Sequence, residues 1–328
     1  VDVQSPFRRH NSTPVSSFVL TAYFNLGSLR WLFFCALLLL YLLIIFSNVL
    51  LVCVIALNRS LHEPMYMFLC SLFINELYGS AALIPFLLVH ILRDVHIVPA
   101  PFCFLQIYVI YGYAVIQLQM LAGMSYDRYV AICHPLHYRT RMSRNRTVAL
   151  ILFPWTYGLL ATGVTIGLSS SLELCGNNID RVYCANYPIV RLACYDTTII
   201  NIYGIVMTFN VIVYPLIVIS YTYLYILKVC WRGEKRTRQK ALNTCAPHLA
   251  SVLNFAVAGF FEILQGRFNM SHVPNMLRVF LSLYSLLCQP LFNPLIYGLI
   301  LGLNKIPPCV SSWTSTARCV SNSAAPTD

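Results

Sequence analysis

The sequence predicts an all-α membrane protein, a seven-transmembrane helix bundle with its N-terminus outside the cell and its C-terminus inside. Its 328 residues are 58% hydrophobic and 10% charged, whereas soluble domains carry about 25% charged residues. Such a chain cannot cover itself with a polar surface in water. Long apolar runs follow one another along it, and basic residues gather in the loops on one side of them.

The apolar runs are long enough to cross a bilayer, because about 20 helical residues span the hydrocarbon core. The first run, 31–57, contains no Asp, Glu, Lys or Arg. Further runs are expected at about 64–92, 100–133, 148–168, 198–229, 241–264 and 273–303. One run could be a buried helix of a soluble protein, but seven predict a membrane domain over 29–303. Residues 1–28 are then an extracellular tail and residues 304–328 a cytoplasmic tail.

The distribution of Lys and Arg sets the expected orientation, because cytoplasmic loops of membrane proteins carry an excess of both. Fourteen of the 22 Lys and Arg lie on one side, and the excess follows the third and fifth runs. That side is expected to be cytoplasmic. The net charge of +11 is thus a feature of topology, and no nucleic acid is expected as a partner. We expect a multi-pass protein of the plasma membrane, surrounded by the lipid bilayer.

Cysteine and glycosylation signals fit this topology. The triplet that begins at Asn11 is a glycosylation acceptor in the extracellular tail. Four cysteines fall outside: Cys103, Cys175, Cys184 and Cys194. Four cysteines allow three pairings, and a bridge from Cys103 would pin the later loop over the bundle mouth. Because the chain has no CxxC pair and no complete HExxH motif, no metal centre is expected from cysteine or histidine.

Charged residues inside the apolar runs are expensive, because a charge at the bilayer centre costs at least about 2.5–3.5 kcal/mol. Glu76 is the acid that lies deep in a run; it could form a polar knot with Asn48 and Asn293, an ion site or a proton carrier. Asp127 and Arg128 lie where the third run meets the cytoplasm. If the two charges neutralise each other, the pair could stabilise a closed arrangement of the helices, which would open when neighbouring helices move. Alternatively, Arg128 only reaches the headgroups.

Five motifs resemble a known family. The stretch MSYDRYVAICHPLHY, from Met124, resembles the MAYDRYVAICxPLxY signature of vertebrate odorant receptors, within the rhodopsin-like G-protein-coupled receptors. Similar motifs follow at family spacing: LHEPMYMFLCSL from Leu61, LACYDT from Leu192, KALNTCAPHLAS from Lys240 and PLFNPLIYGL from Pro290. The match runs from about residue 29 to residue 299, and the sixth run resembles those of fish receptors.

The resemblance implies a receptor, not an enzyme, that binds a small odorant and activates a stimulatory heterotrimeric G protein. In the third run it implies that Asp127 is a lock, that Arg128 faces the G protein and that Tyr129 is its neighbour. It implies a seventh-run switch made of Asn293, Pro294 and Tyr297. It implies the disulfides Cys103–Cys184 and Cys175–Cys194. Glu76 stands where the family has Asp, so an allosteric sodium ion near Glu76 and Asn48 is the one cofactor considered.

The family's geometry places the ligand in the extracellular half of the bundle. The residues expected to contact it are Gln106, Ile110, Tyr111, Ala114, Tyr203, Met207, Asn210, Val257, Phe260, Phe261, Phe280 and Tyr284. Any of them could instead be packing core, because pocket and core share their composition. Two positions depart from the family: Gln117 replaces a second acid, and Ala256 a usual aromatic residue. The tail after residue 303 also differs.

Three other functions remain compatible with the sequence. A non-olfactory chemosensory receptor of the same family would differ in the tissue that expresses it. A transporter would carry internal repeats and several charges at mid-membrane, whereas we find no repeat and only Glu76 at depth. An intramembrane enzyme would need a polar catalytic cluster, and the sequence places His90, His96 and His248 outside any such group.

Overall fold

The computed structural model describes residues 15–23, 27–232, 235–267 and 272–305. The expected glycosylation acceptor Asn11 and almost all of the tail 304–328 lie outside the described residues.

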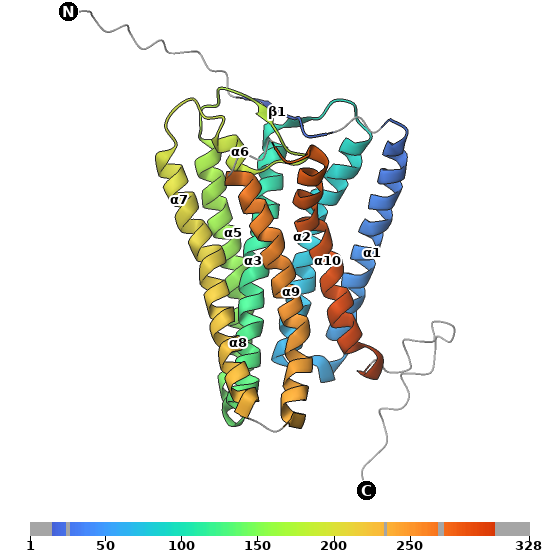
Figure 1. The fold of residues 1–328 in the computed structure, drawn as a ribbon, viewed down its shortest axis with the longest axis vertical. Coiled ribbons are helices and arrows are strands. Elements are labelled where there is room, and N and C mark those ends of the chain that lie inside the picture. Colours follow the sequence, from blue (N-terminus) through green and yellow to red (C-terminus); the bar gives the residue numbers. More distant parts are fainter. Residues whose placement is uncertain (1–14, 24–26, 233–234, 268–271, 306–328) are drawn as a thin grey trace, which may run out of the picture.

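The described chain forms a bundle of long helical segments that lie side by side (Figure 1). Each apolar run of the sequence coincides with one of these segments. They are α1 (Leu29–Leu57), α2 (Pro64–Ile91), α3 (Ala100–Cys133), α5 (Arg144–Ser170), α7 (Thr198–Thr208) with α8 (Tyr214–Arg232), α9 (Lys235–Arg267) and α10 (Asn275–Lys305). The shorter helices lie in the connections: η1 (Arg59–Leu61), η2 (Pro135–His137), α4 (Tyr138–Arg141) and α6 (Asn186–Val190). A π-helical turn, η3 (Phe209–Val213), joins α7 to α8.

Length and apolar composition identify membrane-crossing helices among the described residues. Five helices meet both criteria, and a sixth is added if the two halves of α10 count as one bent span. The halves, Met276–Tyr284 and Leu286–Gly298, meet at 42°. The bend has a local cause: Pro290 lacks the N–H that would bond the carbonyl of Leu286, and its ring crowds that carbonyl.

Helix α3 is the central element of the bundle. It contacts α2, α5, α8 and α9, and buried residues occur along almost its whole length. By contrast, none of the residues of α7 and η3 is buried. A side chain on α3 can therefore reach most other helices, whereas α7 covers only the edge of the bundle.

A small sheet closes one end of the bundle, and the sequence analysis did not predict it. The central strand is β1 (Ser17–Leu20), antiparallel to β2 (Ile97–Pro99) and parallel to β3 (Asn178–Ile179). The side chain of Phe18 is fully buried beneath it. Part of the segment 1–28, which was expected to be an extracellular tail, is thus fixed to the bundle through β1 (Figure 1).

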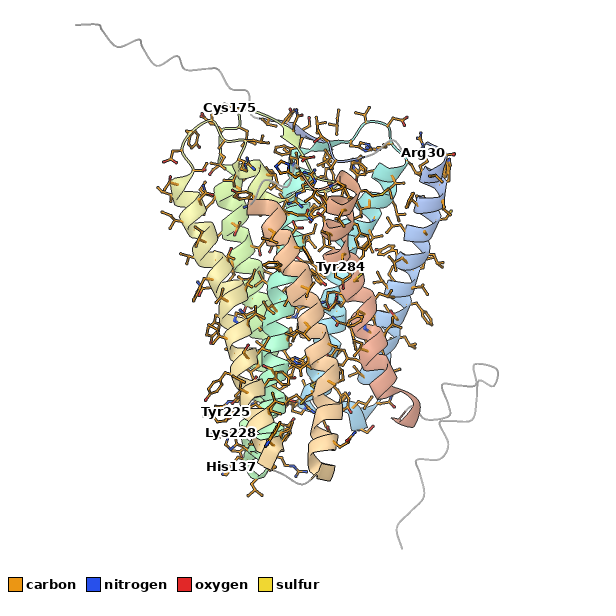
Figure 2. The ribbon with its side chains drawn as sticks, in the orientation of Figure 1. Arg30, His137, Cys175, Tyr225, Lys228 and Tyr284 are labelled. Carbon is orange, nitrogen blue, oxygen red and sulfur yellow. A yellow bond between two sulfur atoms is a disulfide. The ribbon has the colours of Figure 1, made fainter. Side chains whose placement is uncertain are left out.

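The two ends of the bundle carry different structural features and different labelled residues (Figure 2). We call the end with β1, β2, β3 and both disulfides the sheet end; Cys175 and Arg30 lie there. We call the other end the Arg128 end, where Figure 2 shows His137, Tyr225 and Lys228.

Candidate sites in the helix bundle

Glu76 is the centre of a buried hydrogen-bond network at mid-bundle. Its side chain is fully buried on α2, and its carboxylate accepts three hydrogen bonds from neutral groups. The donors are Gln117 Nε2 at 2.7 Å, the Tyr113 hydroxyl at 2.9 Å and Asn293 Nδ2 at 2.5 Å. A buried carboxylate without such donors would be very costly. Gln117, which departs from the family pattern, is therefore a direct partner of Glu76.

Asn293 connects this network to two further helices. Its Oδ1 accepts a hydrogen bond of 2.7 Å from Ser251 on α9, while its amide donates to Glu76 on α2. The side chain is fully buried. Asn293 thus ties α10 to both helices, and Tyr297, one turn further along α10, is 3% exposed.

Asn48 forms different hydrogen bonds from those with Glu76 and Asn293 that the sequence suggested. Its Nδ2 donates to the carbonyl oxygens of Ile44 and Pro290, each at 2.8 Å. The carbonyl of Pro290 would normally bond the N–H four residues later, but Pro294 has none. Asn48 supplies the missing donor, so α1 satisfies a carbonyl group of α10 that Pro294 leaves unpaired.

Glu76 and several buried amide groups carry oxygen atoms of the kind that bind a small hard cation. Among the described residues, the buried amide oxygens of Asn48, Asn75 and Gln289 have no hydrogen-bond donor. Hard cations are bound by carboxylate, carbonyl and amide oxygens, and the set contains one carboxylate and several such oxygens. No group of three or more His, Cys, Asp or Glu side chains gathers as a metal site in the described part of the chain.

Asp127 and Arg128 form a closed pair near the opposite end. Arg128 donates from Nε at 3.0 Å and from Nη2 at 2.6 Å to Oδ2 of Asp127. The other oxygen, Oδ1, accepts a hydrogen bond of 2.8 Å from the Tyr138 hydroxyl on α4. Burial, together with the Asp127 carboxylate, raises the pKa of Tyr138, so this phenol stays protonated and can donate. Asp127 is fully buried, and Tyr129 makes a separate contact of 3.1 Å with His134.

His248 links three helices at the Arg128 end, a role that the sequence analysis did not assign. Its Nδ1 lies 2.7 Å from the Tyr223 hydroxyl on α8, and its Nε2 lies 2.9 Å from the Leu121 carbonyl oxygen on α3. A carbonyl oxygen only accepts, so Nε2 carries the proton and Nδ1 accepts from the phenol. The fully buried ring is therefore a neutral bridge between α9, α8 and α3.

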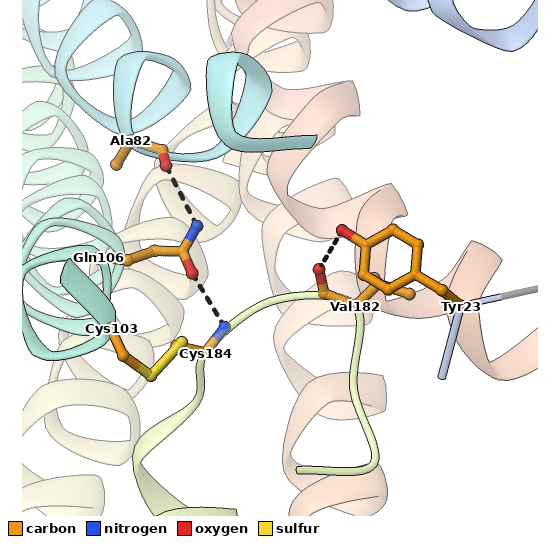
Figure 3. The surroundings of a disulfide bond; sticks show 6 residues. All are labelled: Tyr23, Ala82, Cys103, Gln106, Val182 and Cys184. Carbon is orange, nitrogen blue, oxygen red and sulfur yellow. Dashed lines mark hydrogen bonds between the residues drawn. A yellow bond between two sulfur atoms is a disulfide. The ribbon is translucent and has the colours of Figure 1, made fainter. Parts of the chain in front are cut away.

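Two disulfides hold the loop between α5 and α7 at the sheet end. The structure pairs Cys103 with Cys184 and Cys175 with Cys194, as the resemblance implied. Gln106, one turn along α3 from Cys103, accepts from the Cys184 amide at 2.9 Å and donates to the Ala82 carbonyl at 3.2 Å (Figure 3). Gln106 was expected to contact a ligand, but here its amide group positions the loop.

A polar cluster, formed by Arg181, Glu262, Gln265 and Ser282, lies where this loop meets α9 and α10. Nη1 of Arg181 donates to Gln265 Oε1 at 2.8 Å and to Ser282 Oγ at 2.9 Å. It also lies 3.6 Å from Glu262 Oε1. Arg181 is 8% exposed although it belongs to a loop. Arg181 and Glu262 were not predicted from the sequence as site residues; an acid near the outer end of the sixth run was the available signal.

The structure brings only some of the expected ligand residues to the bundle interior. Ile110 is 6% exposed, and Tyr111, Ala114, Met207 and Phe261 are half-buried. Tyr284, also half-buried, donates to Asn254 Oδ1 at 2.5 Å, and Tyr203 points toward α5, where its hydroxyl lies 3.4 Å from the Ala161 carbonyl oxygen.

Four others lie on the outer surface of the bundle. Val257 is 49% exposed, Phe260 59% and Phe280 61%, and Asn210, also exposed, donates to the carbonyl of its own helix at Val206. Helical spacing explains the first two, because the buried face of α9 contains His248 and Val252 and residues 257 and 260 point away from it.

The inner face of α9 borders an open space near the sheet end. Gly259 shares the face of His248 and Val252, and apart from its own helix no heavy atom of the described residues lies within 4 Å of where a Cβ would stand on it. Phe255 and Glu262 lie one turn away on either side along the same face. Interior positions are normally close-packed, so the inner face of α9 is less tightly packed at Gly259 than a core position would be.

Comparison with known proteins identifies the family. The family model described as olfactory receptor matches residues 34–310. Olfactory receptor 10A6 of Homo sapiens is 35% identical over 293 residues, which cover 89% of this chain and 92% of that protein. Olfactory receptor 226 of Rattus norvegicus is 33% identical over 298 residues, covering 89% and 90%. Both relatives are mammalian, so the likeness of the sixth span to fish receptors stays a prediction. The chain belongs to the olfactory receptor family, and is a multi-pass, G-protein-coupled receptor and not an enzyme.

Proposed function

We propose that this receptor binds small, mostly apolar odorants inside the sheet-end half of the bundle and activates a stimulatory heterotrimeric G protein at the Arg128 end. The observation that carries the first part is the open space at Gly259. Apolar side chains such as Ile110 and a few polar groups, those of Glu262 and Tyr284, lie on the surrounding helices. Ligand sites combine such an apolar lining with a small number of polar groups.

The sheet end is proposed to face outside the cell, at the plasma membrane. Disulfides form in oxidising compartments, and both disulfides lie at this end. Basic residues gather at the other end, among them Arg139 and Arg141 on α4 and Lys228 on α8, as they do on the cytoplasmic side of membrane proteins. Glycosylation of Asn11 is part of the same proposal.

Activation is proposed as a shift in population between two arrangements of the bundle. An odorant that binds the open arrangement more tightly would favour it by the difference between its two binding free energies. The Glu76–Asn293–Ser251 chain crosses from α2 to α10 and α9, so movement of α9 or α10 must disturb it. Opening at the Arg128 end would release Arg128 from Asp127 and expose it to the G protein.

Leu136 is a second candidate contact for the G protein. Its side chain is 93% exposed in the connection after α3, beyond the membrane-crossing part of that helix. A large apolar side chain that projects into water gains from burial in a partner's surface. Leu136 and Arg128 lie close in sequence at the same end of the bundle, so one partner can contact both.

A sodium ion beside Glu76 is proposed as an allosteric ligand. The Glu76 carboxylate supplies the negative charge, and the amide oxygens of Asn48 and Gln289 supply neutral ligands that are otherwise unsatisfied in the described structure. The ion would offset the charge of Glu76 and hold α1, α2 and α10 together.

The proposal is tested by measuring cyclic AMP in cells that express the receptor with an olfactory stimulatory G protein. Cells are challenged with mixed odorants, and surface expression is measured for every variant. Gly259→Phe puts a large side chain into the open space and should abolish the responses. Gly167→Phe is the matched control. Apart from its own helix, no heavy atom of the described residues lies within 4 Å of its Cβ position either, but Gly167 is exposed on α5. Full responses from a well-expressed Gly259→Phe would place the ligand elsewhere.

Arg128→Ala tests the second part of the proposal in the same cells. Because the proposal assigns Arg128 to the G-protein contact, the variant should lose cyclic AMP production while it still reaches the surface. Normal odorant-dependent cyclic AMP from this variant would refute the assigned role.

A further inference from the structure

We propose that Glu262 selects the ligand: its Oε2 accepts a hydrogen bond from a neutral odorant that carries an O–H group. The receptor would then prefer alcohols to ketones and ethers of the same carbon skeleton. This inference rests on the proposed function and adds a ligand class to it.

One oxygen of the Glu262 carboxylate already has a positively charged partner. Oε1 faces Nη1 of Arg181 at 3.6 Å, and Arg181 is fixed by Gln265 and Ser282 at 2.8 and 2.9 Å. Ser282 also donates to Gln265 Oε1 at 2.7 Å. The loop, α9 and α10 therefore hold the carboxylate in one orientation.

The other carboxylate oxygen of Glu262, Oε2, has no hydrogen-bond donor of its own. Glu262 Oε2 is buried and has no hydrogen-bond partner among the described residues. The phenol of Tyr183 lies close to this carboxylate, but it does not have the geometry of a hydrogen bond to Oε2. A buried acceptor without a donor costs about 1–3 kcal/mol, so a ligand that supplies the donor gains most of that cost back on binding.

The open space beside Gly259 would let a ligand reach Oε2 of Glu262. Gly259 lies one helical turn before Glu262 on the same face of α9, and the space beside it is open. Phe255 lies a further turn away and is packed against the apolar core. The body of an odorant beside Gly259 and Phe255 would therefore end next to the carboxylate.

The opposite charges of Arg181 and Glu262 favour a neutral ligand at this position. A cationic ligand at Oε2 would also approach the guanidinium of Arg181, and an anionic one would approach the Glu262 carboxylate. Either encounter brings like charges together away from bulk water, where repulsion is strong. An alcohol or phenol donates a hydrogen bond and carries no charge, so it satisfies Oε2 without this cost.

The test compares secondary alcohols with the ketones and methyl ethers of the same carbon skeleton, using cyclic AMP as the readout. Wild-type receptor should respond to the alcohol at about a tenfold lower half-maximal concentration, the value expected for one hydrogen bond to a charged group. Glu262→Gln places an amide donor where Oε2 stood, so the preference should move toward the ketone. Glu173→Gln is the control, because Glu173 is an exposed acid in the loop that also contains Arg181.

The outcomes separate this inference from the proposed function. Equal responses of the wild type to alcohol and ether would overturn the inference, whether or not Glu262→Gln reaches the surface. So would an alcohol preference that persists in a well-expressed Glu262→Gln receptor. Neither result affects the ligand site at Gly259, which fails only if Gly259→Phe responds normally.

Discussion

Replacing Tyr138 with Phe should raise the activity of the receptor in the absence of odorant. The buried carboxylate of Asp127 has one oxygen bound by Arg128 and the other, Oδ1, bound by Tyr138 at 2.8 Å. Tyr138→Phe removes the second bond and changes no charge. A hydrogen bond to a charged group contributes about 1.5–3 kcal/mol. If Tyr138 and Asp127 separate on activation, this loss destabilises only the resting arrangement.

The expected shift follows from the same numbers. Each 1.4 kcal/mol changes an equilibrium constant about tenfold, so the ratio of active to resting receptor should rise about 10- to 150-fold. The assay is cyclic AMP without odorant, divided by surface expression, with Tyr195→Phe at the sheet end as the control for loss of an exposed phenol. Unchanged basal activity at equal surface expression would show that Tyr138 does not hold the resting state.

Three further predictions concern stability. Cys103→Ser should reduce surface expression and thermal stability more than Cys175→Ser, because the first bridge joins residues 81 apart and the second 19 apart. Asn48→Leu leaves the Pro290 carbonyl unpaired and should cost about 1–3 kcal/mol, seen as a lower melting temperature of purified receptor; no change would mean that water or another donor replaces Asn48. Replacing sodium with choline should lower the melting temperature of the wild type but not of Glu76→Gln, and an equal response of both would refute the sodium site.

Most of the helices could be predicted because their signal is local. An apolar run of sufficient length must form a helix in lipid, since unsatisfied backbone groups are too costly there. The run at 100–133 coincides with α3, and the others differ from their helices by only a few residues at each end. The sheet at Ser17–Leu20 could not be predicted, because each strand is short and its partners lie about 80 and 160 residues away in sequence.

The candidate site was less predictable than the fold because α9 is apolar on more than one face. Val257 and Phe260 are as suitable for a pocket by composition as Phe255, but only packing decides which face is buried. Glu262 and Arg181 are ordinary charged residues at the ends of a helix and in a loop until folding brings them together. Asn48 looked like a partner of Glu76, whereas the absence of an N–H at Pro294 directs it to Pro290.

The sequence by itself determined the membrane class, the positions of the helices and the family, since each depends on hydropathy or on motifs read along the chain. It also determined that charges such as Glu76 and Asp127 would need partners, because an unpaired charge in lipid is too costly. Only the tertiary structure decided which partners those are: Gln117 and Tyr113 for Glu76, and Tyr138 for the second oxygen of Asp127. Hydrogen bonds depend on distances of a few ångströms between helices, and neither composition nor spacing along one helix fixes such distances.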